Sequence, residues 1–262
     1  MKRWLALPLA LLLSSPALAE IRGEEVRYSA DGVNLHGYIA WDDSVSGPRP
    51  GVIVVHEWWG HNDYVRDRAR QLAALGYTAL AVDMFGDGRT ADHPDNAGAF
   101  AREVAQNADI RRSRFNAAMD VLNAHPTVKN DQLAALGYCF GGSVVLNMAR
   151  EGAPLAGVVA YHAGLASPVA AQAGVTQSRV RVFNGAADPM VPPEQVAAFE
   201  AEMRASGVDF AVVNYDGVLH GFTNPGADAF AERFGLPLGF DEAADSDSWA
   251  QTQSFLQELF AQ

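Results

Sequence analysis

A cysteine lies in a setting suited to a nucleophile. Cys139, the only cysteine of the 262 residues, lies in the run Gly137-Tyr138-Cys139-Phe140-Gly141-Gly142, between an apolar run and a helical pattern. Glycines two positions before and after it permit the sharp strand-to-helix turn of a nucleophile elbow. The start of a helix also favours thiolate over thiol. A packed cysteine in a glycine-rich turn is the structural alternative, and the spacing does not fit a dinucleotide-binding loop.

Two later residues fit the partners that such a nucleophile needs. A nucleophile elbow requires an acid and then a histidine, each after a later strand. Asp188 follows the apolar run 179–183, and His220 follows the run 210–215. Alone, Asp188 reads equally well as a turn residue before Pro189, and His220 as a loop histidine. Their order and positions predict a Cys139–His220–Asp188 triad that performs acyl transfer.

The loop after the apolar run 51–55 reads His56-Glu57-Trp58-Trp59-Gly60-His61. Its histidines are five residues apart rather than four and belong to no helical pattern, so we expect no metal there. In proteins built around a nucleophile elbow, this loop and the residue after the nucleophile provide the amides of the oxyanion hole. The backbone amides of Trp58 and Phe140 are therefore expected to hold the developing negative charge.

Strands and helices alternate along the chain, which predicts an α/β fold with a mostly parallel sheet flanked by helices. The expected strands cover residues 25–29, 33–41, 51–56, 78–83, 133–139, 157–162, 179–184 and 210–215. The expected helices cover residues 63–75, 95–124, 142–150, 193–205 and 246–259. The first two strands flank Asp31-Gly32 and are expected to form an antiparallel hairpin at the sheet edge. Such sheets bind ligands at the carboxyl ends of their strands, where the predicted triad would lie.

The elbow, the loop carrying Glu57, Ala187-Asp188-Pro189 and His220-Gly221-Phe222 together resemble the dienelactone hydrolase family. The resemblance runs from about residue 25 to the C-terminus. It implies a single α/β-hydrolase domain, a Cys-His-Asp triad, and a glutamate, Glu57, that contacts the nucleophile and takes part in its activation. From the residues alone, Glu57 is equally a carboxylate that orders its loop.

The sequence departs from this family in its substrate-binding residues. Dienelactone hydrolases hold a substrate carboxylate with arginines, one of them shortly after the catalytic histidine, whereas this chain has no arginine between His220 and Arg233. Arg89 and Arg102 are candidates to replace it, but the sequence does not place them. Aromatic residues predict an apolar mouth instead, and His162 ends a strand near the site. The expected substrate-binding residues are Trp59, Phe85, His162 and Phe222.

The first 19 residues predict a secretory signal peptide. Met1-Lys2-Arg3 precedes an apolar run over residues 4–13, and Ala17-Leu18-Ala19 forms a cleavage site before Glu20. Cleavage would leave a periplasmic or secreted domain of residues 20–262 that is not attached to the membrane; we expect a monomer. With 31 Asp and Glu against 19 Lys and Arg, the net charge is −12, which disfavours nucleic acid as a partner.

The sequence thus predicts a hydrolase that cleaves a small ester or lactone through an acyl-thioester on Cys139, without a cofactor. A general carboxylesterase or thioesterase is the alternative among enzymes. A non-hydrolytic protein on the same scaffold, with a thiol that binds a ligand or senses oxidants, is the alternative from another class.

Overall fold

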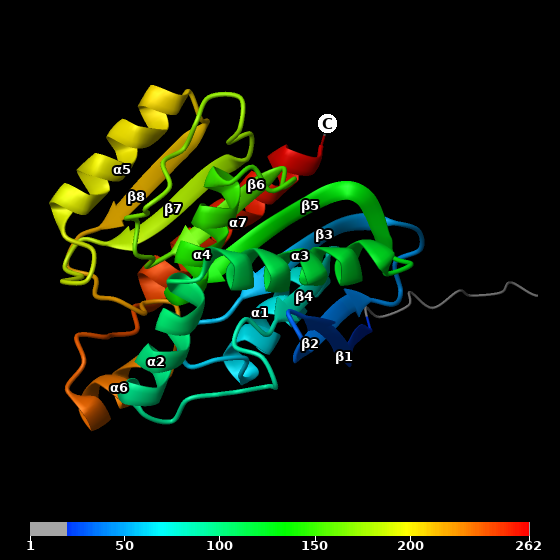
Figure 1. Ribbon diagram of the computed structural model, residues 1–262, viewed down its shortest axis with the longest axis horizontal. Coiled ribbons are helices and arrows are strands. Elements are labelled where there is room, and N and C mark those ends of the chain that lie inside the picture. Colours follow the sequence, from blue (N-terminus) through cyan, green and yellow to red (C-terminus); the bar gives the residue numbers. More distant parts are fainter. Residues whose placement is uncertain (1–19, 262) are drawn as a thin grey trace, which may run out of the picture.

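A computed structural model describes residues 20–261, so the predicted signal peptide lies outside the described part. These residues form an eight-stranded sheet of order β1-β2-β4-β3-β5-β6-β7-β8 (Figure 1). Its strands are β1 (Ile21–Ala30), β2 (Val33–Asp42), β3 (Arg49–Val55), β4 (Thr78–Val82), β5 (Val128–Tyr138), β6 (Gly157–Tyr161), β7 (Arg179–Gly185) and β8 (Phe210–Tyr215). β1 and β2 form the expected antiparallel hairpin, β2 is antiparallel to β4, and the strands from β4 to β8 are parallel. The predicted α/β-hydrolase fold is confirmed.

Seven helices of the described residues pack around this sheet. They are α1 (Asp63–Ala74), α2 (Pro94–Ala105), α3 (Ala108–Ala124), α4 (Phe140–Arg150), α5 (Pro193–Ser206), α6 (Ala227–Phe234) and α7 (Glu242–Phe260). One apolar core lies between the sheet and α3, α4 and α5, and a second lies between the sheet and α1 and α7. Along β3, Ile53 and Val55 belong to the first core, and Val52 and Val54 belong to the second. Because side chains alternate between the faces, a strand buried on both sides has a continuous apolar sequence.

The helices differ from the prediction in three places. The expected helix 95–124 is two helices, because the chain leaves the helical path at Asn107, whose side-chain oxygen accepts hydrogen bonds from the Asp109 and Ile110 amides and caps α3. The last helix begins at Glu242, four residues earlier than expected, with Asp241 as its cap. Helix α6 was not predicted at all, since it is only eight residues long.

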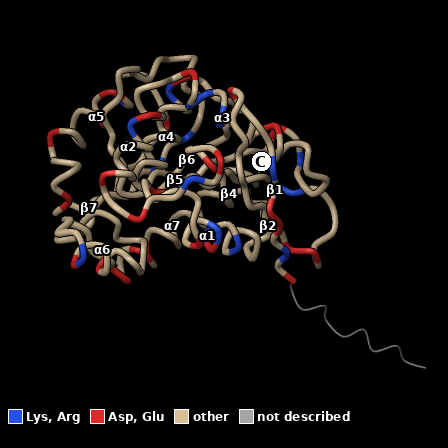
Figure 2. Tube along the Cα trace, turned by 60° about the horizontal axis from the view of Figure 1, so that its bottom comes forward, with Lys and Arg blue, Asp and Glu red and all other residues tan. Residues whose placement is uncertain are grey.

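Helices α2 and α6 lie together beyond one end of the sheet (Figure 1), where His93, the N-cap of α2, packs edge-on against Phe234 of α6 at 5.3 Å between ring centroids. Acidic residues are spread over helices and loops on all sides of the molecule (Figure 2). No helix among residues 20–261 is long and apolar enough to cross a membrane.

Candidate active site

Cys139 lies at the junction of β5 and α4 and has a strained backbone. Its φ of 54° and ψ of −116° are unusual for a residue with a side chain. The neighbouring glycines make this turn possible. A Cβ on Gly137 would lie 2.1 Å from the carbonyl oxygen of Gly141, and a Cβ on Gly141 would lie 2.3 Å from the carbonyl oxygen of Val55. The cysteine is partly exposed and is the N-cap of α4, so it has the position of an elbow nucleophile.

Asp188 and His220 meet beside this turn. Asp188 follows β7 and His220 follows β8, and Nδ1 of His220 lies 2.7 Å from Oδ2 of Asp188. Nε2 of His220 is buried and has no hydrogen-bond partner among the described residues. Burial alone would lower the pKa of His220, but the charge of Cys139 and the hydrogen bond to Asp188 outweigh it and raise the pKa to about 10. His220 therefore carries its proton as an imidazolium at neutral pH.

Glu57 is a second buried carboxyl at this site. Its side chain accepts a hydrogen bond of 2.6 Å from Nδ2 of Asn224, a residue 167 positions away in the sequence. Burial raises the pKa of Glu57 to about 7, although Asn224, His220 and Arg68 each act to lower it. The carboxyl group can therefore change its charge near neutral pH.

The two amides expected to form the oxyanion hole lie next to these groups in the chain. Phe140 is the first residue of α4, and Trp58 follows Glu57 in the loop after β3. Within residues 20–261 neither N–H donates to a carbonyl or a side chain. Both donors are thus available to a ligand. The Phe140 ring stacks on His56, whose Nδ1 lies 2.6 Å from the carbonyl oxygen of Glu57 and whose Nε2 accepts from the Met84 amide. These contacts fix the Glu57 loop against α4.

The residues expected to bind substrate are all buried. Phe85, His162 and Phe222 are 0% exposed and Trp59 is 3% exposed, so none offers a free face to solvent. Trp59 stacks on Phe230 of α6, with 4.2 Å between ring centroids. Trp58, whose ring packs against that of Trp59, is half-buried and therefore more exposed than these four residues. Direct contact of these four residues with substrate stays a prediction. In the structure they pack against residues of the site: Phe85 against Phe140, His162 against His220, Phe222 against His162 and Trp59 against Trp58.

Neither candidate arginine is poised as a clamp. Arg89 is paired with Glu103 and bonded to the Phe85 carbonyl, while its guanidinium stacks on Phe100. Arg102 lies exposed on α2. No group of three or more His, Cys, Asp or Glu side chains able to hold a metal ion occurs between residues 20 and 261.

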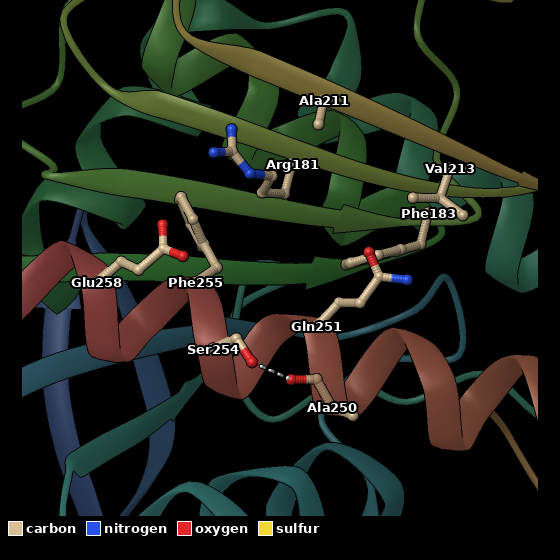
Figure 3. A pocket seen from close by; sticks show the side chains of 9 residues that line it. All are labelled: Arg181, Phe183, Ala211, Val213, Ala250, Gln251, Ser254, Phe255 and Glu258. Carbon is tan, nitrogen blue, oxygen red and sulfur yellow. Dashed lines mark hydrogen bonds between the residues drawn. The ribbon is translucent and has the colours of Figure 1, made fainter.

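A groove of about 350 Å³ between α7 and the strands β7 and β8 lies away from this chemistry (Figure 3). None of its lining residues belongs to the predicted triad. Phe183, Val213 and Phe255 form its apolar wall, and Arg181 and Glu258 lie at one end. Because neither Cys139 nor His220, Asp188 or Glu57 lines this groove, we place the active site at the strand ends and not here.

Comparison with known proteins shows the family to which the chain belongs. The family model described as the dienelactone hydrolase family matches residues 35–260. The chain belongs to the dienelactone hydrolase family. This membership confirms the resemblance seen in the sequence and makes the chain a carboxylic ester hydrolase.

Among individual relatives, Protein usf of Aquifex pyrophilus is 28% identical over 90% of this chain and 98% of its own length. A relative in Aquifex aeolicus that carries the name carboxymethylenebutenolidase is 27% identical over 77% of this chain and 87% of its own. The solved structure of a dienelactone hydrolase-like promiscuous phosphotriesterase from metagenomic libraries is 38% identical, covers 91% of this chain and 98% of its own, and superposes with a TM-score of 0.86.

Asn224 is the residue of this dienelactone hydrolase family site that sequence reasoning missed. Asn224 lies in the stretch after His220 where dienelactone hydrolases have an arginine, and a neutral amide at that position gives no sign of a contact with Glu57. No local pattern links it to Glu57, since the two residues meet only when the loops after β3 and β8 come together at one edge of the sheet.

Proposed function

We propose that this chain hydrolyses small, uncharged esters or lactones through a covalent thioester on Cys139. The observation that carries the proposal is the 2.7 Å contact between Asp188 and His220, beside a cysteine on a strained elbow. Asp188 orients the imidazole, and the free Nε2 of His220 is the atom that exchanges protons with the reactants.

In the first half of the reaction, the Cys139 thiolate attacks the carbonyl carbon and forms a C–S bond. The carbonyl oxygen becomes an oxyanion, which accepts hydrogen bonds from the Trp58 and Phe140 amides. The intermediate then collapses, the ester C–O bond breaks, and the His220 imidazolium gives its proton to the leaving alkoxide. An acyl-thioester remains on Cys139; in a lactone the freed hydroxyl stays attached to the acyl chain.

In the second half, neutral His220 takes a proton from water, and the hydroxide attacks the thioester carbon. The C–S bond breaks, the carboxylic acid leaves, and the thiolate and imidazolium are restored. Glu57 takes part by its charge. A carboxylate beside the sulfur opposes thiolate formation, and a protonated carboxyl does not, so the reactivity of Cys139 depends on the state of Glu57.

The surroundings of the site favour a neutral substrate. Arg89 already has an anionic partner, and Arg102 lies exposed on α2. A substrate carboxylate buried without a cation would be costly. Small acyl groups of low polarity fit the aromatic walls better.

A panel of p-nitrophenyl esters, thioesters and enol-lactones, run with the parent protein and Cys139→Ala, tests this function. We expect turnover by the parent and a loss of at least about 10³-fold in Cys139→Ala. A general esterase or thioesterase would prefer the open-chain substrates to the lactones. If the parent hydrolyses no substrate of the panel in a Cys139-dependent way, the proposed hydrolase activity is wrong. That result favours a non-hydrolytic protein whose thiol binds a ligand or senses oxidants.

A second candidate activity is phosphotriester hydrolysis, which is favoured by the 38% identity to a structure carrying the name of a promiscuous phosphotriesterase. The thiolate would attack phosphorus and expel the alkoxide or phenolate, leaving a phosphorylated cysteine that water must hydrolyse. With paraoxon, repeated release of p-nitrophenolate supports this activity. Release of a single equivalent means that Cys139 is only trapped.

A further inference from the structure

A buried arginine, Arg68, bonds the loop that follows His220. Arg68 of α1 is 5% exposed, and its Nη2 donates to the carbonyl oxygen of Thr223 at 2.7 Å and to Oδ1 of Asp245 at 2.5 Å. Nη1 donates to Gln71 at 3.1 Å. The guanidinium also lies 5.3 to 5.5 Å from the ring centroids of three aromatic residues, Tyr64, Tyr138 and Trp249. A cation held by so many partners from different elements has one fixed position.

The partners of Arg68 lead directly to the catalytic groups. Tyr138 immediately precedes Cys139 in the chain. Thr223 precedes Asn224, whose side chain holds Glu57, and follows His220 by three residues. The Thr223 hydroxyl is itself fixed, since it bonds Tyr64 at 2.6 Å and Nε2 of His162 at 2.8 Å. Arg68 thus fixes the main chain of the loop that carries both His220 and Asn224.

We propose that Arg68 is a positioning residue for Glu57: it clamps the Thr223 carbonyl and so sets the Asn224 amide, and its charge favours the ionised carboxylate. The inference rests on the proposed function, in which the charge of Glu57 controls Cys139. Asp245 moderates the effect, because its carboxylate offsets part of the Arg68 charge.

The groups facing Glu57 allow the effect to be measured as a pH dependence. They are Arg68, His220, Tyr64 and Tyr138, and the proposed function adds the thiol of Cys139. The pKa of His220 is about 10, and burial raises the pKa of both tyrosines above the ordinary tyrosine value, so these groups keep their charge between pH 5 and 8. Burial lowers the pKa of His162 well below its ordinary value, and the charge of His220 lowers it further. A transition of the carboxyl C=O infrared band near pH 7 that disappears in Glu57→Gln therefore belongs to Glu57, since a thiol has no such band.

The experiment compares Arg68→Met with Arg70→Met, which replaces an exposed arginine on the same helix. Protonation of Glu57 is followed against pH by the infrared C=O band of its carboxyl group, which is identified by its absence in Glu57→Gln. The second measurement is kcat/KM for a p-nitrophenyl ester. In Arg68→Met we expect the Glu57 transition to move up by roughly one pH unit. A protonated Glu57 alone would favour the thiolate, so the fall of about 10- to 100-fold that we expect in kcat/KM reports the lost positioning of the loop that carries His220 and Asn224. Arg70→Met should leave both unchanged. Arg68→Lys should restore the transition but only part of the rate, because an ammonium lacks the guanidinium fork.

Asp245→Asn supplies a change of the opposite sign if Arg68→Met does not fold. Loss of this anion leaves the Arg68 charge less compensated, so the Glu57 transition should move down. If Arg68→Met folds and its Glu57 transition does not move, the proposed role of Arg68 is wrong. If Arg68→Met does not fold, an unchanged Glu57 transition in Asp245→Asn has the same consequence. Cys139→Ala is run beside these variants: full turnover in that variant rejects the proposed function instead, and the infrared titration still reports on Arg68.

Discussion

At the scale of single residues, Glu57 combines a cost in stability with the role in reactivity that we propose. Its carboxyl is buried against Asn224, and burial raises its pKa from 4.5 to about 7. A carboxyl that binds its proton more tightly in the folded state makes the protein less stable as the pH rises from the unfolded pKa through the folded one. The window here runs from about pH 4.5 to about pH 7.

Glu57→Gln should therefore stabilise the protein above pH 7 while it changes the chemistry. The amide keeps the acceptor oxygen for Asn224 but never ionises, so we expect a gain of up to about 3 kcal/mol at pH 8 and no gain at pH 4. The measurement is the free energy of urea unfolding at both pH values. An equal change at both would show that the carboxyl charge is not the cause.

The same substitution should alter the thiol. The start of a helix and a cationic His220 are surroundings that favour a thiolate at Cys139, whereas in the proposed function an ionised Glu57 opposes it. We expect Glu57→Gln to alkylate with iodoacetamide faster than the parent above pH 7 and at a similar rate at pH 5, where Glu57 is protonated. If neither protein reacts without denaturant, Cys139 is not an accessible nucleophile.

At the scale of elements, the junction of β5 and α4 depends on close backbone contacts. A Cβ on Gly141 would meet the Val55 and His56 carbonyl oxygens at 2.3 and 2.7 Å, and both are main-chain atoms of the core that cannot move away easily. Gly207, the C-cap of α5, has a positive φ, which Gly141 does not, and nothing lies within 4 Å of its Cβ position.

We expect Gly141→Ala to cost more than about 3 kcal/mol of unfolding free energy and to abolish turnover. Gly207→Ala carries only the left-handed strain of about 1–2 kcal/mol and should stay active. Urea unfolding of the two variants, with the ester assay, makes the comparison. A loss in Gly141→Ala no larger than that in Gly207→Ala would mean that the close approach of strand and helix does not govern the elbow.

At the scale of the whole molecule, the charge disfavours an anionic substrate. The net charge is −12, and the acidic residues are spread around the fold (Figure 2), so its field does not steer anions to the site. We expect kcat/KM for the methyl ester of dienelactone to exceed that for the free acid at least about tenfold, a difference of roughly 1.4 kcal/mol. Arg102→Ala should not change this ratio. A strong preference for the free acid, lost in Arg102→Ala, would identify Arg102 as the clamp.

The export of the chain remains a prediction at this same scale. Ala17-Leu18-Ala19 follows the apolar run at the distance of a signal cleavage site, so the mature protein should begin at Glu20. N-terminal sequencing of protein from the periplasmic fraction checks this. Protein that keeps Met1 and stays in the cytoplasm would contradict it.

The sequence by itself determined the fold class and the positions of the reactive residues. Continuous apolar runs predicted the parallel strands because both faces of such strands are buried. Gly137 and Gly141 marked the elbow because no larger residue fits there, and the order of Cys139, Asp188 and His220 followed from the strand ends. Each of these signals is local or periodic, so a single sequence carries it.

Only the tertiary structure decided which distant side chains meet. Asn224 pairs with Glu57 across 167 residues and Arg68 with the Thr223 carbonyl across 155, and such contacts leave no spacing in the sequence. The same limit applies to Phe85 and Phe222. Their sequence positions beside the strand ends suggested a mouth, but the packing of the loops turns both rings into the interior. Composition tells which side chains avoid water, but their orientation depends on the neighbours that the fold brings to them.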